Sequence, residues 1–172
     1  YLVREGVCSG DFWIYDMDDF IKRIEGNEGH KHSTLLDSSY NEWLFDYNSM
    51  EDTRDRRFSY YFKGPIVGFL MDIYIRRETG NKRSLDDVMR TLYTEYYKGL
   101  KRGFTEDELW TVITKVARCD MSEMRRYVET SDDIDYGRLL GYAGLKLQGF
   151  NIQKLGKCDK PAMKIRKSLL RY

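Results

Sequence analysis

Two adjacent tyrosines, Tyr60 and Tyr61, open the segment of this chain that is best suited to chemistry. They lie in the run Ser-Tyr-Tyr-Phe-Lys-Gly at residues 59–64, which leads into an apolar stretch at residues 65–75. A helix that is apolar on nearly every side must be buried, so its first turn is held in one place. A phenol on that turn can donate a hydrogen bond from a fixed position. The residues alone also allow a simpler interpretation, in which each tyrosine fills the core and its hydroxyl reaches water or a carbonyl.

The apolar helix has one stripe of small or polar residues, formed by Gly68, Asp72 and Arg76 at intervals of four residues. This spacing places Asp72 and Arg76 on one face, where we expect them to form an ion pair. Gly68 also lies four residues after Gly64. Two glycines at this spacing would allow a neighbouring backbone to come close.

Two residues beside the tyrosines bear on how their turn is held. Pro65 removes a helical hydrogen bond and clashes with the carbonyl of Tyr61, so the helix either begins near Pro65 or is kinked there. Lys63 is interpreted as a solvated charge or as a partner for a helix end. Both helix alternatives predict a distorted turn held against the buried part of the helix.

Other metal-binding or reactive residues are sparse. His30 and His32, the only histidines, lie in a polar loop flanked by glycines and lack a nearby third ligand, so we interpret them as solvated. No H-E-x-x-H motif occurs. The three cysteines have no C-x-x-C spacing, which predicts neither a disulfide framework nor a structural zinc site. We therefore predict no metal-binding and no cofactor-binding residue within this chain.

Composition favours an ordinary soluble domain. The chain has 172 residues, of which 41% are hydrophobic and 33% charged, and this length suits one domain with a real core. The longest apolar run falls well short of the roughly 20 residues that a membrane span needs. No signal peptide is visible. Residues 1–6 are predicted to be the last turn of a helix ending at Gly6, as if the chain were cut from within a longer protein.

Apolar residues recur at helical spacing almost throughout, which predicts an all-α fold, an irregular bundle of about seven helices. Ser9 is predicted to cap the first helix. Ser84 with Asp87, and Thr105 with Glu108, have the spacing of capping boxes. Residues 48–57 are polar and are predicted to form a loop. The predicted helices cover residues 13–24, 36–47, 65–78, 85–96, 106–117, 121–128 and 136–143.

The C-terminal region is a separate compositional block. Residues 146–172 carry eight basic side chains and one acidic one, whereas the first 145 residues are net negative. We predict two short strands near residues 145–152 and a short basic helix capped by Asp159, with a domain boundary after residue 147. This block supports an alternative function, in which the chain is a non-catalytic helical binding module whose basic tail, residues 148–172, holds an acidic partner. Few aromatic residues accompany the charges, so nucleic acid is not the expected partner.

Several segments, taken in order, resemble the glycyl aminopeptidase family of thermolysin-like zinc metallopeptidases. The resemblance covers residues 1–147, and Pro65 departs from the family's usual pattern. The matching segments are Ser38-Ser39-Tyr40-x-x-Trp43, Ser59-Tyr60-Tyr61-Phe62-Lys63-Gly64, Ile73-x-Ile75-Arg76, Ser84-Leu85-Asp86-Asp87-Val88-Met89-Arg90, Gly103-Phe104-Thr105-Glu106-x-Glu108 and Leu139-Leu140-x-x-Ala143-Gly144-Leu145.

The resemblance implies that residues 1–147 are the helical subdomain that closes the cleft of a gluzincin-type peptidase. It implies a zinc ion in the full-length protein, held by an H-E-x-x-H helix and a glutamate in an N-terminal part that would be this chain's partner, with a peptide as substrate. Tyr61 then matches the tyrosine that hydrogen-bonds the tetrahedral intermediate, and Tyr60 is the second candidate. The isolated chain is expected to be inactive, because the zinc motif is missing from it.

Overall fold

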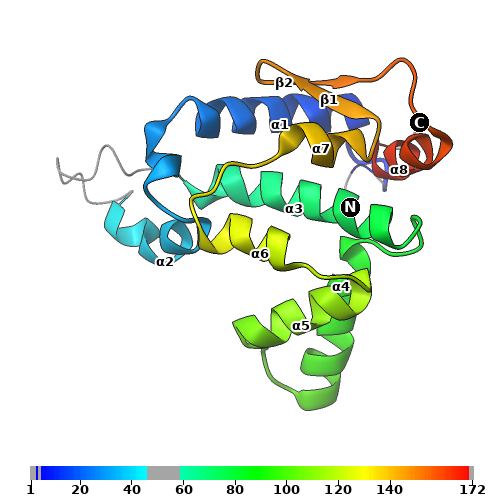
Figure 1. Cartoon of the computed structure of the whole chain (residues 1–172). Helices are drawn as coiled ribbons and strands as arrows, with labels where there is room; N and C mark the ends of the chain where they lie inside the picture. The colour runs from blue at the N-terminus through cyan, green and yellow to red at the C-terminus, as the bar shows by residue number, and fades with distance from the viewer. Residues whose placement is uncertain (1–2, 4, 46–58, 171–172) are drawn as a thin grey trace.

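Helix α3 (Tyr60–Glu78) lies at the centre of the fold, and it contacts all seven other α-helices of the part of the chain that the structure describes. The structure is a computed structural model that describes residues 3, 5–45 and 59–170. Within those residues it contains eight α-helices and one two-stranded sheet (Figure 1). The prediction of an all-α fold is therefore confirmed, and the eighth helix is the short basic helix predicted after Asp159.

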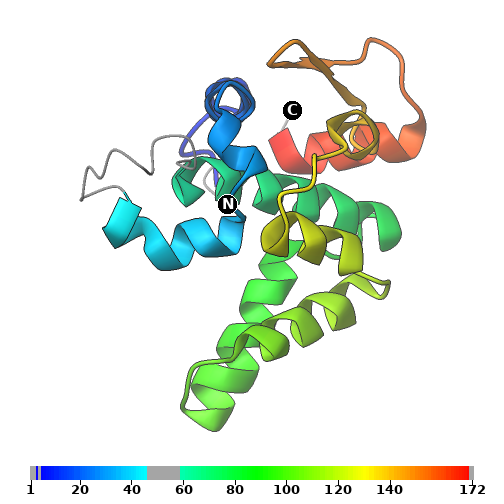
Figure 2. The same ribbon diagram turned by 60° about the vertical axis from the view of Figure 1, so that its left-hand side comes forward.

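The other elements surround α3, as two views of the ribbon show (Figures 1 and 2). A short 3-10 turn, η1, follows α1, and a π-helical segment, η3, continues α4. Their bounds are α1 (Gly10–Glu25), η1 (Glu28–Lys31), α2 (Leu35–Phe45), α4 (Leu85–Leu92), η3 (Tyr93–Leu100), α5 (Glu106–Ala117), α6 (Ser122–Glu129), α7 (Tyr136–Gly141), β1 (Leu145–Gln148), β2 (Asn151–Lys154) and α8 (Lys160–Leu170).

Predicted caps begin several of these helices. Ser9 accepts a hydrogen bond from the backbone N–H of Phe12 at 3.0 Å and begins α1. Glu108 accepts from the backbone N–H of Thr105 at 2.8 Å and completes the predicted capping box of α5. Each cap satisfies backbone donors that the first helical turn leaves without a partner, and this fixes where the helix starts.

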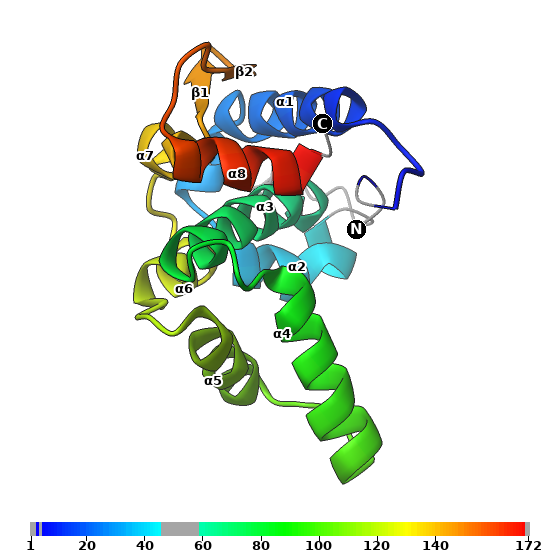
Figure 3. The same ribbon diagram turned by 90° about the vertical axis from the view of Figure 1, so that its right-hand side faces the viewer.

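Helices α4 and α5, with η3, form an arm that projects from the body of the molecule (Figure 3). Val88 and Leu92 of α4 are buried, but Met89 is 61% exposed and Tyr93 is 52% exposed. The apolar residues that recur at helical spacing on this segment are therefore only partly buried. Helix α5 covers only one side of α4, and the projecting arm leaves the other side in water.

The C-terminal block is folded against the body. The two predicted strands are present as β1 and β2. They pair antiparallel, with Leu145 opposite Lys154. Asp159 accepts from the backbone N–H of Ala162 at 2.7 Å and begins α8, which packs against α1 and α3. The approach to α1 is close, since a Cβ atom on Gly10 would lie 2.5 Å from the carbonyl oxygen of Leu170. Strand β1 runs across residue 147, after which a domain boundary is predicted. The boundary itself stays a prediction.

In the described part of the chain, no helix combines the length and the apolar character that crossing a bilayer requires. The loop predicted at residues 48–57 lies outside the described residues, as does most of the helical turn predicted at residues 1–6.

Candidate functional site

The first turn of α3, which carries Tyr61, is fixed from two directions. Ser59 is the N-cap, and its side chain accepts a hydrogen bond from the backbone N–H of Tyr61 at 3.3 Å. The hydroxyl of Ser59 also donates to Oε1 of Glu42 on α2, at 3.1 Å. The start of α3 is thus capped by its own chain and tied to a neighbouring helix.

Pro65 lies inside α3 and does not begin it. The helix starts at Tyr60 and continues through Pro65, so the alternative in which it begins near Pro65 is wrong. Because Pro65 has no N–H, the carbonyl of Tyr61 lacks its usual helical donor. The cap at Ser59 and the buried remainder of the helix hold the turn in spite of this lost hydrogen bond.

The Tyr61 side chain points outward and is 62% exposed. Its ring stacks on that of Tyr60, with centroids 4.3 Å apart and planes inclined by 27°. Tyr60 is half-buried and packs against the core. The stacking contact reduces the rotational freedom of the Tyr61 ring and leaves much of its surface open to solvent.

The face of α3 that carries Tyr61 also lines an apolar cavity of about 500 Å³. At 100° per residue, Pro65, Gly68 and Asp72 lie within about 40° of Tyr61 on the helix surface. Helices α1, α4 and α8 complete the walls, and three carboxylates stand among the apolar side chains. The lining residues are Val3, Cys8, Phe12, Trp13, Asp16, Pro65, Gly68, Phe69, Asp72, Leu85, Asp86, Met89 and Leu169.

Both glycines on this side of α3 are open. Apart from the chain neighbours of each glycine and the nearby backbone of α3 itself, no atom of the described residues lies within 4 Å of the position that a Cβ atom would occupy on Gly64 or on Gly68. No described segment of this chain therefore packs its backbone against these two glycines, as their spacing would allow. Close approach by the backbone of a partner stays a prediction.

Lys63, on the opposite side of the same turn, is buried and only 2% exposed. The prediction that it is a solvated charge is wrong. Its position is 200° round the helix from Tyr61, which turns it toward the core. Burial lowers the pKa of the Lys63 amine, and this is opposed by the carboxylates of Glu25, Asp132 and Asp133.

Glu25 links further polar groups behind the tyrosine turn. The Tyr136 hydroxyl donates to Oε1 of Glu25 at 2.9 Å. Burial, followed by the charge of Glu25, raises the pKa of Tyr136. Nε2 of His30 lies 3.7 Å from Oε2 of Glu25. These groups come from α1, η1 and α7, and they enclose the inner side of the α3 start.

One of the two histidines is buried, and the other is exposed. His30 is buried, and its Nδ1 lies 2.5 Å from the carbonyl oxygen of Asn27, so the prediction that it is solvated is wrong. His32 is exposed, as predicted. The 3-10 turn η1 directs the His30 side chain inward. The sequence pattern of a polar loop flanked by glycines does not predict this burial.

Within residues 3, 5–45 and 59–170, no three or more histidine, cysteine or acidic side chains are grouped so that they could hold a metal ion. The donor set of the described residues therefore does not fit the zinc centre that the resemblance implies for the complete protein. A zinc ion would need ligands from elsewhere.

The Asp72–Arg76 ion pair is confirmed. Nε of Arg76 donates to Oδ2 of Asp72 at 3.1 Å, and both side chains are less than a tenth exposed. Oδ1 of Asp72 accepts from the backbone N–H of Leu85 at 2.7 Å, and Nη1 of Arg76 donates to Oδ1 of Asn81 at 3.0 Å. This network connects α3 to the start of α4.

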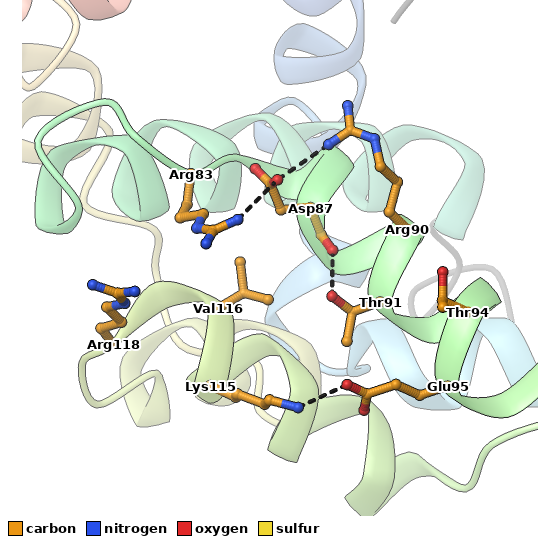
Figure 4. Close-up of a pocket in the computed structure, with 9 residues that line it drawn as sticks. All are labelled: Arg83, Asp87, Arg90, Thr91, Thr94, Glu95, Lys115, Val116 and Arg118. Atoms are coloured by element: carbon orange, nitrogen blue, oxygen red, sulfur yellow. Dashed lines mark hydrogen bonds and ion pairs between the residues drawn. The ribbon is translucent and has the colours of Figure 1, made fainter. Parts of the chain in front are cut away.

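A second hollow, which the sequence patterns did not single out, lies between α4 and α5 (Figure 4). It has a volume of about 490 Å³ and is rich in charge. Its lining residues are Arg83, Asp87, Arg90, Thr91, Thr94, Glu95, Lys115, Val116 and Arg118. Six of the nine are charged, and in the sequence a charged residue in a helical segment looks like a solvated side chain.

Comparison with protein families adds one finding. Residues 1–67 match the family model of the M61 glycyl aminopeptidase. The match covers about two-fifths of the chain and ends within α3, so it contains Tyr61. The segments after residue 67 that resemble the glycyl aminopeptidase family lie outside it. The comparisons with curated proteins and with solved structures gave no match.

Proposed function

We propose that this chain is the helical part of a zinc aminopeptidase similar to the M61 glycyl aminopeptidase family, and that it closes the active-site cleft. The observation that carries the proposal is Tyr61, an exposed phenol on an anchored turn within the matched residues 1–67. Gly64 and Gly68 leave the same side of α3 uncovered, with a cavity beside it. In the complete protein this surface faces an N-terminal part, which supplies the zinc.

Tyr61 acts as a hydrogen-bond donor in this proposal. Attack on a scissile amide gives a tetrahedral intermediate, and negative charge collects on the former carbonyl oxygen. The phenol of Tyr61 donates to that oxygen, and this contact is stronger with the charged intermediate than with the neutral substrate. Because Ser59 and the Tyr60 ring restrict the turn and the side chain, the donor needs little reorganisation when the charge forms.

Substitution of Tyr61 by phenylalanine tests this role in a protein that includes the preceding N-terminal part. Removing one such donor lowers kcat by roughly 10²–10³-fold, with little change in KM. Hydrolysis of an N-terminal glycyl amide measures both constants. Tyr15→Phe is the matched control, because Tyr15 is a comparably exposed tyrosine on α1. An unchanged kcat in Tyr61→Phe removes the residue from the mechanism, and a loss confined to Tyr60→Phe transfers the role to Tyr60.

Gly68→Ala tests whether a partner covers this side of α3. In the isolated chain the added methyl group meets no described atom, and replacing a helical glycine stabilises the fold by about 0.5–1 kcal/mol. In the complete enzyme the same methyl group occupies the space of the docked part, so activity falls. Urea denaturation measures the first effect and peptidase assays the second.

Gly141→Ala is the control for this pair of measurements. Gly141 is also helical and also has no described atom near its Cβ position, but it lies on α7. It should leave activity unchanged. Full activity in Gly68→Ala would show that no partner packs closely on this face.

A further inference from the structure

The hollow between α4 and α5 carries a surplus of positive charge. Arg83, Arg90, Lys115 and Arg118 line it, and only two carboxylates, Asp87 and Glu95, face them. Two positive charges are therefore unmatched within the lining. The hollow lies in the arm, away from Tyr61, and does not depend on the proposed peptidase function.

Both carboxylates already accept hydrogen bonds from neighbouring groups. Oδ1 of Asp87 accepts from both Arg83, at 3.5 Å, and Arg90, at 3.1 Å, while its Oδ2 accepts from the backbone N–H of Ser84 at 2.9 Å. Glu95 accepts from Lys115 at 2.8 Å. A guanidinium has five N–H donors, so one shared oxygen leaves most donors of Arg83 and Arg90 facing solvent.

Arg118 is the cation with no acid beside it. It is exposed at the end of α5, where its φ of 58° places it in the left-handed region. Among the described residues, its side chain makes no hydrogen bond or ion pair. Figure 4 shows Arg118 and Arg83 on one side of the hollow, with Val116 between them and the two threonines, Thr91 of α4 and Thr94 of η3.

We propose that this hollow binds a phosphate monoester or inorganic phosphate. A dianion matches the net excess of two positive charges in the lining, and a tetrahedral group of acceptor oxygens suits the forked donors of arginine. Arg83 and Arg118 contact the phosphate oxygens directly, and Lys115 adds a point charge from the lower wall. The hydroxyl of Thr94, which is exposed on the wall formed by η3, is a further donor.

Titration of the 172-residue chain tests the site. Inorganic phosphate is added at constant ionic strength, with chloride as the reference anion, and backbone amide shifts are followed by NMR. Saturable shifts centred on α4 and α5 support the site. A short phosphoserine peptide and its unphosphorylated form are titrated in the same way. Tighter binding of the phosphopeptide than of phosphate indicates a protein ligand, and equal or weaker binding indicates a small phosphate.

Charge-neutralising variants locate the binding. Arg118→Gln and Arg83→Gln should each weaken phosphate binding by roughly three- to tenfold, as expected for losing one exposed charged hydrogen bond. Arg126→Gln is the matched control, since Arg126 is an exposed arginine on α6 that pairs with Asp132 at 3.1 Å outside the hollow. Circular dichroism confirms that each variant is folded. Absence of saturable shifts, or equal losses in Arg118→Gln and Arg126→Gln, would overturn the proposal.

Discussion

Helix α3 and the α4–α5 arm each carry an ion pair in which arginine meets a carboxylate, and the two pairs differ in burial. Nε of Arg76 lies 3.1 Å from Oδ2 of Asp72, where both side chains are less than a tenth exposed. In the arm, Nη2 of Arg102 lies only 2.6 Å from Oε1 of Glu108, but these side chains are 48% and 29% exposed. The shorter pair is the more solvated one. Burial, and not distance, decides what breaking each pair costs.

The same difference separates the proposed roles of the two regions. The start of α3 is packed on its inner side around Lys63, so its outer side can present Tyr61 in one position. The arm carries its cations on long exposed side chains. Such side chains can rearrange around an incoming anion. A rigid donor suits an intermediate with fixed geometry, and mobile cations suit binding of a small anion.

Asp72→Ala should have the largest effect on stability. The substitution leaves the guanidinium of Arg76 buried without its carboxylate and removes the acceptor for the backbone N–H of Leu85. Breaking a buried pair in this way costs about 3–5 kcal/mol of unfolding free energy. Urea denaturation measures it. Arg102→Ala in the arm is the matched comparison and should cause a much smaller loss, so similar losses would contradict the assignment of the difference to burial.

Lys63→Met should change the pH dependence of stability. Burial lowers the pKa of Lys63 below its ordinary 10.5, so the unfolded chain binds a proton more tightly at this site. The cost of burying the charge is fully present below the lowered folded pKa and is relieved as pH rises toward 10.5. The unfolding free energy of the original chain should therefore rise with pH relative to Lys63→Met.

The measurement is urea denaturation at a series of pH values from neutral to about 10, compared between variants. The carboxylates that act on Lys63, Glu25, Asp132 and Asp133, are the same in both proteins, and so are Tyr136 and His30, which contact Glu25. Their own titrations therefore largely cancel in the difference. Lys115→Met, which removes an exposed lysine in the arm, is the comparison variant for the loss of a lysine outside the core. A difference between the original chain and Lys63→Met that stays constant with pH would show that Lys63 keeps an ordinary pKa.

These comparisons show which features the sequence could predict. The starts of α1 and α5 were predictable because Ser9 and the Thr105–Glu108 box act within three residues of themselves. The Asp72–Arg76 pair was predictable for the same reason, since both residues lie on adjacent turns of one helix. Local hydrogen bonds therefore leave a signature in the spacing of the residues that make them.

Burial of the polar side chains behind Tyr61 was not predictable. The charged neighbours of Lys63 lie at Glu25 and at residues 132–133, far away in the sequence. A helix that is apolar on nearly every side has no periodicity that tells its inner face from its outer one. The cavity beside Tyr61 depends on α1, α4 and α8 meeting α3, so its residues could not be grouped before the fold was known.

Arg102→Gln should have the smallest effect on folding and a clear effect on one carboxyl group. The hydrogen bonds from Arg102, with that from the backbone of Thr105, lower the pKa of Glu108 from 4.5 to about 2. Their stabilising contribution is present above pH 4.5 and is lost as pH falls toward 2. In Arg102→Gln the Thr105 N–H remains, so the midpoint should rise toward 4.5 without reaching it, while stability at neutral pH changes little. NMR titration of the Glu108 side chain measures the midpoint. A midpoint that stays near 2 would mean that the hydrogen bond from the Thr105 backbone, and not Arg102, lowers the pKa of Glu108. The comparison with the buried Asp72–Arg76 pair would then contrast a helix cap with an ion pair.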